Sequence, residues 1–259
     1  MNRRKLAVFI AALSGSGGAA PALPTYAEIL RDTYGASEVY PLTNIPSGTT
    51  IHAFVSGAHD GTLSGWTLQN TAGPVTGTLA PTLDGTTANS DIGSLALIWN
   101  GGMGGMFIFG KVSNVADWSD GVSRFLVSYK VDNSNYFQLS KHGTLGLEAW
   151  FSIGGITKVL RSAQTTTDWF SLGLTWKDSA NGNEGKMYVN GAQVGATQTG
   201  FGAWAGTPTI LRLGIASANS SVWKGGLAYN TVKFGSIWSP TEMANAYAAR
   251  LTGGPDVNP

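Results

Sequence analysis

The clearest secondary-structure pattern of the chain lies in Asp168–Val194, DWFSLGLTWKDSANGNEGKMYVNGAQV. Its first half alternates between an apolar face and a mixed face, and the apolar face carries Phe170, Leu172, Leu174 and Trp176. A period of two predicts a β-strand with one buried face. A polar loop follows over Lys177–Glu184, then a second strand over Lys186–Val189. Asn190-Gly191 supplies the positive φ angles of a type I′ hairpin turn, and Ala192–Ala196 returns.

Short strand-like runs also lie on both sides of this hairpin. They are separated by clusters of Gly, Asn, Asp and Ser at roughly ten-residue spacing, the pattern of an all-β sandwich. Gly makes up 36 of the 259 residues, which favours many tight turns over long helices. The predicted strands are Glu38–Leu42, Thr62–Leu68, Met106–Val112, Arg124–Val131, Tyr136–Ser140, Thr144–Phe151, Ile210–Ile215 and Leu227–Ile237.

Two short helices are predicted at the ends of the body. Thr25–Thr33 begins with a capping box, in which Thr25 caps the helix and Glu28 stands three residues on. The second helix begins at Ser239-Pro240, again with a glutamate at the third helical position, Glu242. Gly253-Gly254-Pro255 ends it.

Composition excludes several classes of protein. Charged residues are only 12% of the chain, against a typical share of about 25%, and hydrophobic residues are 42%, which excludes wholesale disorder. The net charge of +1 gives no electrostatic case for nucleic-acid binding. The absence of Cys excludes disulfides, thiolate zinc sites and cysteine nucleophiles.

The first residues, MNRRKLAVFIAAL, combine a basic start with a short apolar run. They have the outline of a secretory signal peptide, and equally suit an arm that docks on a partner subunit through Arg3, Arg4, Lys5 and Phe9. The apolar run is too short to span a bilayer. We expect an arm or signal with its linker over residues 1–24, one domain over 25–252, and a tail over 253–259.

Four stretches resemble the laminin-G-like branch of the concanavalin A-like lectin and glucanase family. They are His59–Gly65 (HDGTLSG), Leu83–Thr86 (LDGT), Trp169–Gly191 with its YVNG hairpin, and Trp223 to Ala246 with its SPTEM turn. The resemblance covers roughly residues 34–251 and implies an antiparallel jelly-roll sandwich. It departs from the family in two places. Leu227–Asn230 stands where the family commonly has an acidic pair, and the glucanase Glu-x-Asp-x-x-Glu run is missing.

The chain is also similar to laminin-G-like proteins frequent in tailed-phage and marine viral genomes. The runs Trp118–Leu126 and Asn190–Gly206 carry this likeness. It implies a virion subunit with capsid or tail proteins as partners, self-association, and a place on the virion surface.

Catalytic and metal-binding chemistry finds little support. Glycoside hydrolysis needs two carboxyl groups across a sugar ring, and Glu148 is the only acid in a strand-like run beside a tryptophan. His52, His59 and His142 lack triad or zinc spacing. Oxygen-bearing residues around two loops could hold calcium, but Asx turns are the favoured explanation, so no metal or other cofactor is predicted. These residues are Asp117, Asp120, Asp132, Asn133 and Asn135.

Exposed tryptophan faces are the remaining candidate for a binding site, because sugar C–H groups pack on aromatic rings while nearby polar groups pair with hydroxyls. Trp118, Trp204 and Trp223 lie in loop-like surroundings, and Asp120 stands near the first. We predict these four residues as glycan-binding. The alternative is that the rings plug the rim of the sandwich or a subunit contact.

Taken together, the sequence predicts an all-β, antiparallel concanavalin A-like jelly-roll sandwich with an extended N-terminal arm and a short C-terminal helix. The leading functional hypothesis is a non-enzymatic structural protein of a phage virion that displays a lectin-like sandwich to surface glycans. A secreted or cell-surface bacterial carbohydrate-binding protein and a polysaccharide-cleaving enzyme are the alternatives. Neither nucleic acid nor a membrane span is expected.

Overall fold

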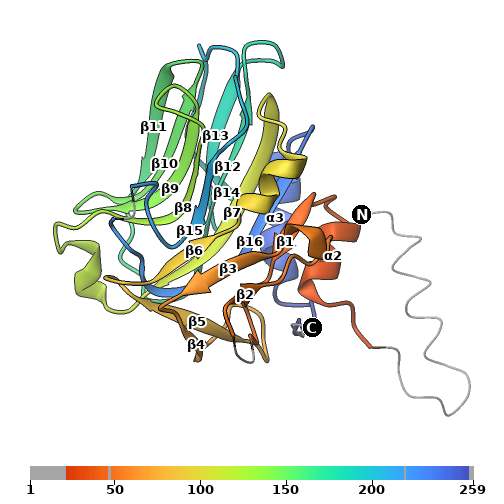
Figure 1. Ribbon diagram of the computed structural model, residues 1–259, viewed down its shortest axis with the longest axis vertical. Helices are drawn as coiled ribbons and strands as arrows, with labels where there is room; N and C mark the ends of the chain where they lie inside the picture. Colours follow the sequence, from red (N-terminus) through yellow and green to blue (C-terminus); the bar gives the residue numbers. More distant parts are fainter. Residues whose placement is uncertain (1–21, 46–47, 219, 257–259) are drawn as a thin grey trace, which may run out of the picture.

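The computed structural model describes residues 22–45, 48–218 and 220–256. Its largest sheet has the strand order β14-β13-β12-β7-β16-β5-β4, with β1 paired to β16 (Figure 1). The pairs within it are antiparallel. The strands are β1 (Glu38–Tyr40), β4 (Thr67–Ala72), β5 (Leu79–Asp84), β7 (Met103–Val112), β12 (Phe170–Lys177), β13 (Glu184–Val189), β14 (Ala192–Gln198) and β16 (Lys224–Phe234).

A five-stranded antiparallel sheet packs against the large one, with the order β11-β10-β9-β8-β15. Its strands are β8 (Arg124–Lys130), β9 (Tyr136–His142), β10 (Gly146–Ile153), β11 (Ile156–Ser162) and β15 (Ile210–Leu213). A third, small sheet consists of β2 (Thr50–Ile51), β3 (Gly61–Ser64) and β6 (Asn89–Asp91). Short 3-10 helices lie at η2 (Gly57–His59), η3 (Gly93–Ile98) and η4 (Val115–Trp118).

The hairpin predicted within Asp168–Val194 is present in the structure. Asn190 and Gly191 have φ angles of 52° and 77°, and β12 pairs with β13 on one side and with β7 on the other. The apolar face of β12 enters the core between the two main sheets, where Trp176 is fully buried and its ring lies 4.4 Å from that of Phe137 on β9. The prediction of an antiparallel jelly-roll-like β-sandwich is therefore confirmed.

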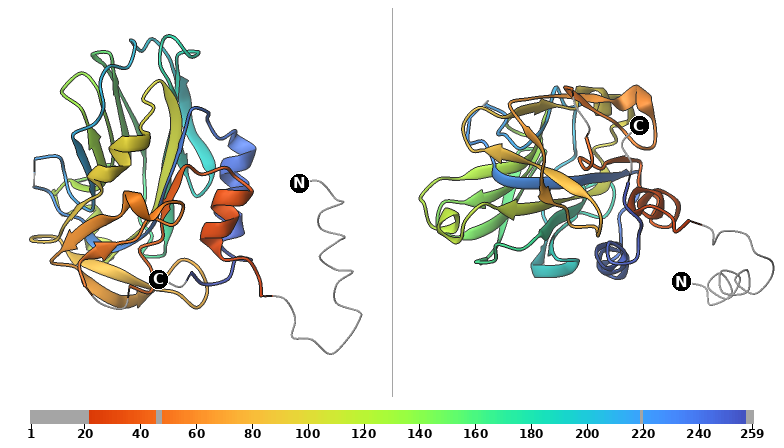
Figure 2. Two further views of the ribbon diagram at one scale, coloured as in Figure 1. Left: turned by 45° about the vertical axis from the view of Figure 1, so that its right-hand side comes forward. Right: turned by 90° about the horizontal axis from the view of Figure 1, so that it is seen from below.

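Two helices cover the outer face of the large sheet, and Figure 2 shows both on the side away from the five-stranded sheet. They are α2 (Tyr26–Asp32) and α3 (Pro240–Ala249), and each begins with the predicted capping box. Their buried residues, among them Tyr26, Leu30 and Met243, form a second apolar cluster with Phe107 and Phe109 of β7. The outer face of the five-stranded sheet has no such cover among the described residues.

Some elements differ from the prediction. The strand expected over Thr62–Leu68 is divided between two sheets, because Gly65 turns the chain with a φ of 71°. Strand β7 begins at Met103, before the predicted start at Met106. A Cβ on Gly105 there would lie 2.9 Å from the ring of Trp238, so glycine allows the close packing. Strands β5 and β11 were not predicted.

The N-terminal arm and its candidates Arg3, Arg4, Lys5 and Phe9 lie outside the described residues. Within the part of the chain that the structure describes, no helix is long and apolar enough to cross a membrane. Residues 253–256 pack against the body, since the Gly254 carbonyl accepts a hydrogen bond of 3.1 Å from the Tyr26 N–H.

Candidate functional site

The uncovered outer face of the five-stranded sheet carries an ordered row of side chains. Strand register places them side by side across all five strands. From edge to edge the row is Arg212, Ser128, Gln138, Trp150 and Val159. Because alternate residues of a strand point to opposite faces, these side chains share the face opposite to the core.

Trp150 is the central aromatic residue of this face. Its neighbours Ala149 and Phe151 point inward and are fully buried, which leaves Trp150 half-buried on the outside. Its indole Nε1 donates a hydrogen bond of 3.1 Å to Oε2 of Glu148. The Arg161 Nε donates to Oε1 of the same carboxylate at 2.6 Å. The indole is therefore held in a fixed orientation by a carboxylate that is only 2% exposed.

Polar groups surround the ring on the same face. The Gln138 side chain lies beside Trp150 and donates a hydrogen bond of 3.1 Å to the Ser128 hydroxyl. The next row along the strands includes Tyr136 and Ser152. An aromatic surface ringed by amide, hydroxyl and guanidinium groups can pack against the C–H face of a sugar while polar groups pair with its hydroxyls. We call this surface, comprising Gln138, Trp150, Arg161, Arg212 and Tyr136, the Trp150 face.

Glu148 is the only acidic residue in the five strands of this sheet. Glycoside hydrolysis requires a second carboxyl group about 5–10 Å away. Both oxygens of Glu148 are engaged, by Arg161 and by Trp150. The structure shows Glu148 as the buried partner of an ion pair with Arg161.

Trp118 and Trp223, predicted as exposed platforms, are buried, so that prediction is wrong at both positions. Trp118 is 5% exposed and its indole donates to the Thr166 carbonyl at 2.8 Å, while Trp223 is 1% exposed and donates to the Gly226 carbonyl at 3.1 Å. Both rings pack on Phe170 at the start of β12. They close this end of the core, and the loop-like sequence around them reflects turns rather than exposure.

Trp204 is half-buried at another part of the core. Its ring stacks on Phe137 with a centroid distance of 4.8 Å and an interplanar angle of 9°. Its indole donates to the Gly206 carbonyl at 2.8 Å, and the ring leaves no room for a side chain at Gly101. The structure therefore does not bring the three predicted tryptophans together in one site.

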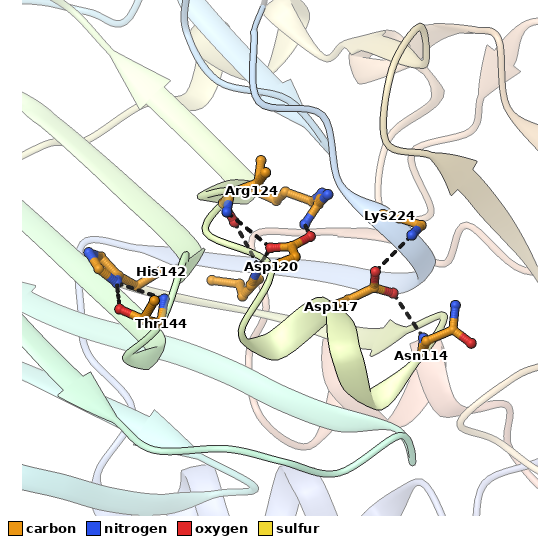
Figure 3. A network of polar contacts seen from close by, with 9 residues as sticks. Asn114, Asp117, Asp120, Arg124, His142, Thr144 and Lys224 are labelled. Atoms are coloured by element: carbon orange, nitrogen blue, oxygen red, sulfur yellow. Dashed lines mark hydrogen bonds and ion pairs between the residues drawn. The ribbon is translucent and has the colours of Figure 1, made fainter.

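Asp120 belongs to a network of ion pairs beside η4 (Figure 3). Its carboxylate binds the Arg124 guanidinium and, at 2.6 Å, the Nζ of Lys141, a lysine whose side chain is almost fully buried. Burial raises the pKa of Asp120, but hydrogen bonds from Lys141, the Val122 N–H and Arg124 outweigh it, so that this pKa is lowered to about 2. The carboxylate is therefore engaged with protein partners.

The other residues considered for calcium also have protein partners. Asp117 pairs with Lys224 at 2.7 Å and accepts the Asn114 N–H, as Figure 3 shows. Asp132 accepts the N–H groups of Ser134 and Asn135, which is an Asx-type turn. No group of three or more His, Asp or Glu residues that could hold a metal ion occurs among residues 22–45, 48–218 and 220–256.

Comparison with solved structures finds the same kind of β-sandwich in several other proteins. Domain 4 of AbnA, a GH43 extracellular arabinanase from Geobacillus stearothermophilus solved with arabinotriose, matches with a TM-score of 0.59 and 15% identity, over 82% of this chain and 98% of that one. A Trypanosoma rangeli sialidase mutant displaying trans-sialidase activity matches with a TM-score of 0.62 and 10% identity, over 98% of this chain and 39% of the sialidase.

The receptor binding domain of botulinum neurotoxin type G matches with a TM-score of 0.57 and 11% identity, over 83% of this chain and 51% of that one. The chain thus spans about half or less of the sialidase and toxin chains. At these identities the likeness shows a β-sandwich fold and nothing finer. No protein-family model and no curated protein matches the sequence.

Trp150 was not among the predicted platforms, although the sequence holds a signal for it. The alternation Leu147, Ala149, Phe151 marks the inward face of β10, and the intervening Glu148 and Trp150 must then point outward. The strand-to-strand register that sets Gln138 and Arg161 beside them depends on long-range pairing and is not readable from local sequence.

Proposed function

We propose that the protein is a non-enzymatic carbohydrate-binding protein that holds saccharides on the Trp150 face. The observation that carries the proposal is the fixed, half-buried indole of Trp150 at the centre of a row of polar side chains. The face is uncovered, whereas the opposite sheet is covered by helices. The lectin-like fold of the similar structures supports this reading.

The Trp150 face favours neutral saccharides. Its one carboxylate is paired with Arg161, the Gln138 amide and the Ser128 hydroxyl lie beside the ring, and the Arg212 guanidinium donates to the Ser217 carbonyl at 3.3 Å. Such groups pair with sugar hydroxyls, and the ring supplies apolar contact area. The single engaged carboxylate also argues against hydrolysis, so incubation with polysaccharides should release no reducing ends. Release that disappears in Glu148→Gln would contradict the non-enzymatic proposal.

A glycan array with the full chain and Trp150→Ala tests the proposal. We expect wild-type protein to bind a set of neutral oligosaccharides and Trp150→Ala to lose at least about tenfold in affinity, because a stacked aromatic contact is worth on the order of 1 kcal/mol or more. Leu97→Ala, at an exposed position outside the Trp150 face, serves as the matched control and should bind these sugars as wild type does. Equal binding by wild type and Trp150→Ala would refute the assignment of this face.

For the setting of this activity, we propose display on a tailed-phage virion, with self-association and attachment to a capsid or tail subunit through the arm. The basic-apolar start and the resemblance of Asn190–Gly206 to viral proteins support it. Deleting residues 1–20 should abolish incorporation into particles while the body keeps its unfolding temperature. A native protein that lacks about 20–25 residues and sediments as a small soluble species would instead support a secreted bacterial protein.

A further inference from the structure

We infer that the protein has a second saccharide site, on the large sheet, that selects sugars bearing a negative charge. A hollow of about 300 Å³ opens between β4, β5, β7 and β16. This volume lies at the lower end of the range typical of small-molecule sites. Its lining includes Asn70, Thr71, Thr82, Lys111, Gly225 and Gly226.

The hollow lies on the helix side of the large sheet. Lys111 follows Phe107 and Phe109 at alternate positions of β7, and both phenylalanines pack with the helices. Alternate residues share a face, so Lys111 belongs to the part of this face that the helices leave open. The hollow is therefore on the opposite sheet from Trp150 and forms a separate site.

A fixed aromatic ring borders the hollow at Gly226. Trp169 is half-buried, and its indole Nε1 donates a hydrogen bond of 2.7 Å to the Ala72 carbonyl at the end of β4. A Cβ on Gly226 would lie 2.7 Å from Cη2 of this ring, so glycine lets the indole approach the sheet. At Gly225 a Cβ would lie 1.9 Å from the Lys111 carbonyl. Both glycines keep the floor free of side chains.

The polar groups of the hollow define the ligand. Asn70 Nδ2 donates to the Thr82 hydroxyl at 2.9 Å, which holds an amide and a hydroxyl side by side at the wall. Lys111 forms no ion pair among the described residues, whereas nearby Lys224 is paired with Asp117. One unpaired ammonium among hydroxyls, an amide and an indole suits a sugar ring with one carboxylate or sulfate. The overall charge of +1 gives no support to a long polyanion.

Calorimetric titration of the full chain with an oligogalacturonate tests this inference. Its methyl-esterified counterpart has the same rings without the charge, and a sulfated galactan oligosaccharide separates sulfate from carboxylate recognition. We expect the charged sugars to bind more tightly than the ester, and less tightly as salt rises. Lys111→Met should lower affinity for the charged sugars by about ten- to hundredfold, the loss expected for one hydrogen bond to a charged group, and leave the ester unchanged.

Three further variants keep the outcome decisive. Lys158→Met removes the same charge from the edge of the other sheet and should bind as wild type does. Trp169→Ala should weaken all three sugars, and its unfolding temperature shows whether the fold is kept. Trp150→Ala should not change binding of the oligogalacturonate. Equal binding by wild type and Lys111→Met, or loss only in Trp150→Ala, would overturn the second site without touching the proposal for the Trp150 face.

Discussion

Single ionised side chains stabilise this fold by holding other charged side chains in place. Asp120 is the clearest case, because it accepts from Lys141 and Arg124 and its pKa is lowered to about 2. A carboxylate with a lowered pKa stabilises the fold above its unfolded pKa of about 3.8, and this contribution is lost as the pH falls from about 4 to 2. The shift corresponds to about 2 kcal/mol.

We therefore expect Asp120→Asn to lower the free energy of unfolding by up to about 2 kcal/mol at pH 7. This is an upper value, because the ion pair also requires a buried lysine. Burial lowers the pKa of Lys141 more than the contact with Asp120 raises it, and this cost offsets part of the stabilisation. The difference between variant and wild type should shrink to a small part of its value near pH 2, where about half of the Asp120 carboxylates are protonated. Urea denaturation at the two pH values measures it, and a difference as large at pH 2 as at pH 7 would contradict the ion-pair account.

At the same scale, burial explains why the tryptophan sites were mispredicted. Gly, Ser and Asp around Trp118 and Trp223 give no sign that both rings turn inward onto Phe170. Trp118 lies about 50 positions before Phe170 and Trp223 about 50 positions after it, so both contacts depend on the tertiary fold. The inward and outward faces of β10 could be predicted from the sequence, because alternation is local.

Among the elements, α3 shows how local sequence and packing reinforce each other. The Ser239 hydroxyl accepts the Glu242 N–H at 3.2 Å, and the Glu242 carboxylate accepts the Ser239 N–H at 2.7 Å. Ser239→Ala should therefore lower the free energy of unfolding by about 1 kcal/mol. Ser236→Ala, on the exposed loop before the helix, is the matched control. Equal free energies of unfolding for the two variants in chemical denaturation would show that the Ser239 cap does not stabilise the fold.

The capping boxes and the YVNG hairpin could be predicted because each is specified within a few residues. Strand β11 was missed because its sequence, ITKVLRS, does not alternate between apolar and polar residues. Strand β5 was missed because it contains Pro81, which argues against a strand. The division at Gly65 was missed because only the tertiary fold shows that β3 and β4 join different sheets.

On the scale of the whole molecule, the chain ends hold the helix layer onto the sandwich. Asp256 is buried and accepts hydrogen bonds from the Tyr229 hydroxyl at 2.5 Å and from the Ala27 N–H at 3.1 Å. It thereby joins the C-terminal segment to β16 and α2.

Asp256→Ala leaves these two donors without an acceptor and should lower the free energy of unfolding by about 1–3 kcal/mol. Asp168→Ala, at an exposed position, is the control. Unchanged thermal unfolding of Asp256→Ala would show that the C-terminal segment does not secure the helix layer.

The layered fold also gives the molecule two unlike faces. The outer face of the large sheet is covered by helices except at the Lys111 hollow, and the outer face of the five-stranded sheet around Trp150 is uncovered. The most direct test of carbohydrate binding on the latter is an NMR titration of the tryptophan indole signals with the neutral oligosaccharide that binds best on the array. We predict that the Trp150 signal, assigned by its loss in Trp150→Phe, shifts with the sugar while those of buried Trp176 and Trp223 stay fixed. Shifts confined to other indoles, or none at all, would contradict the account.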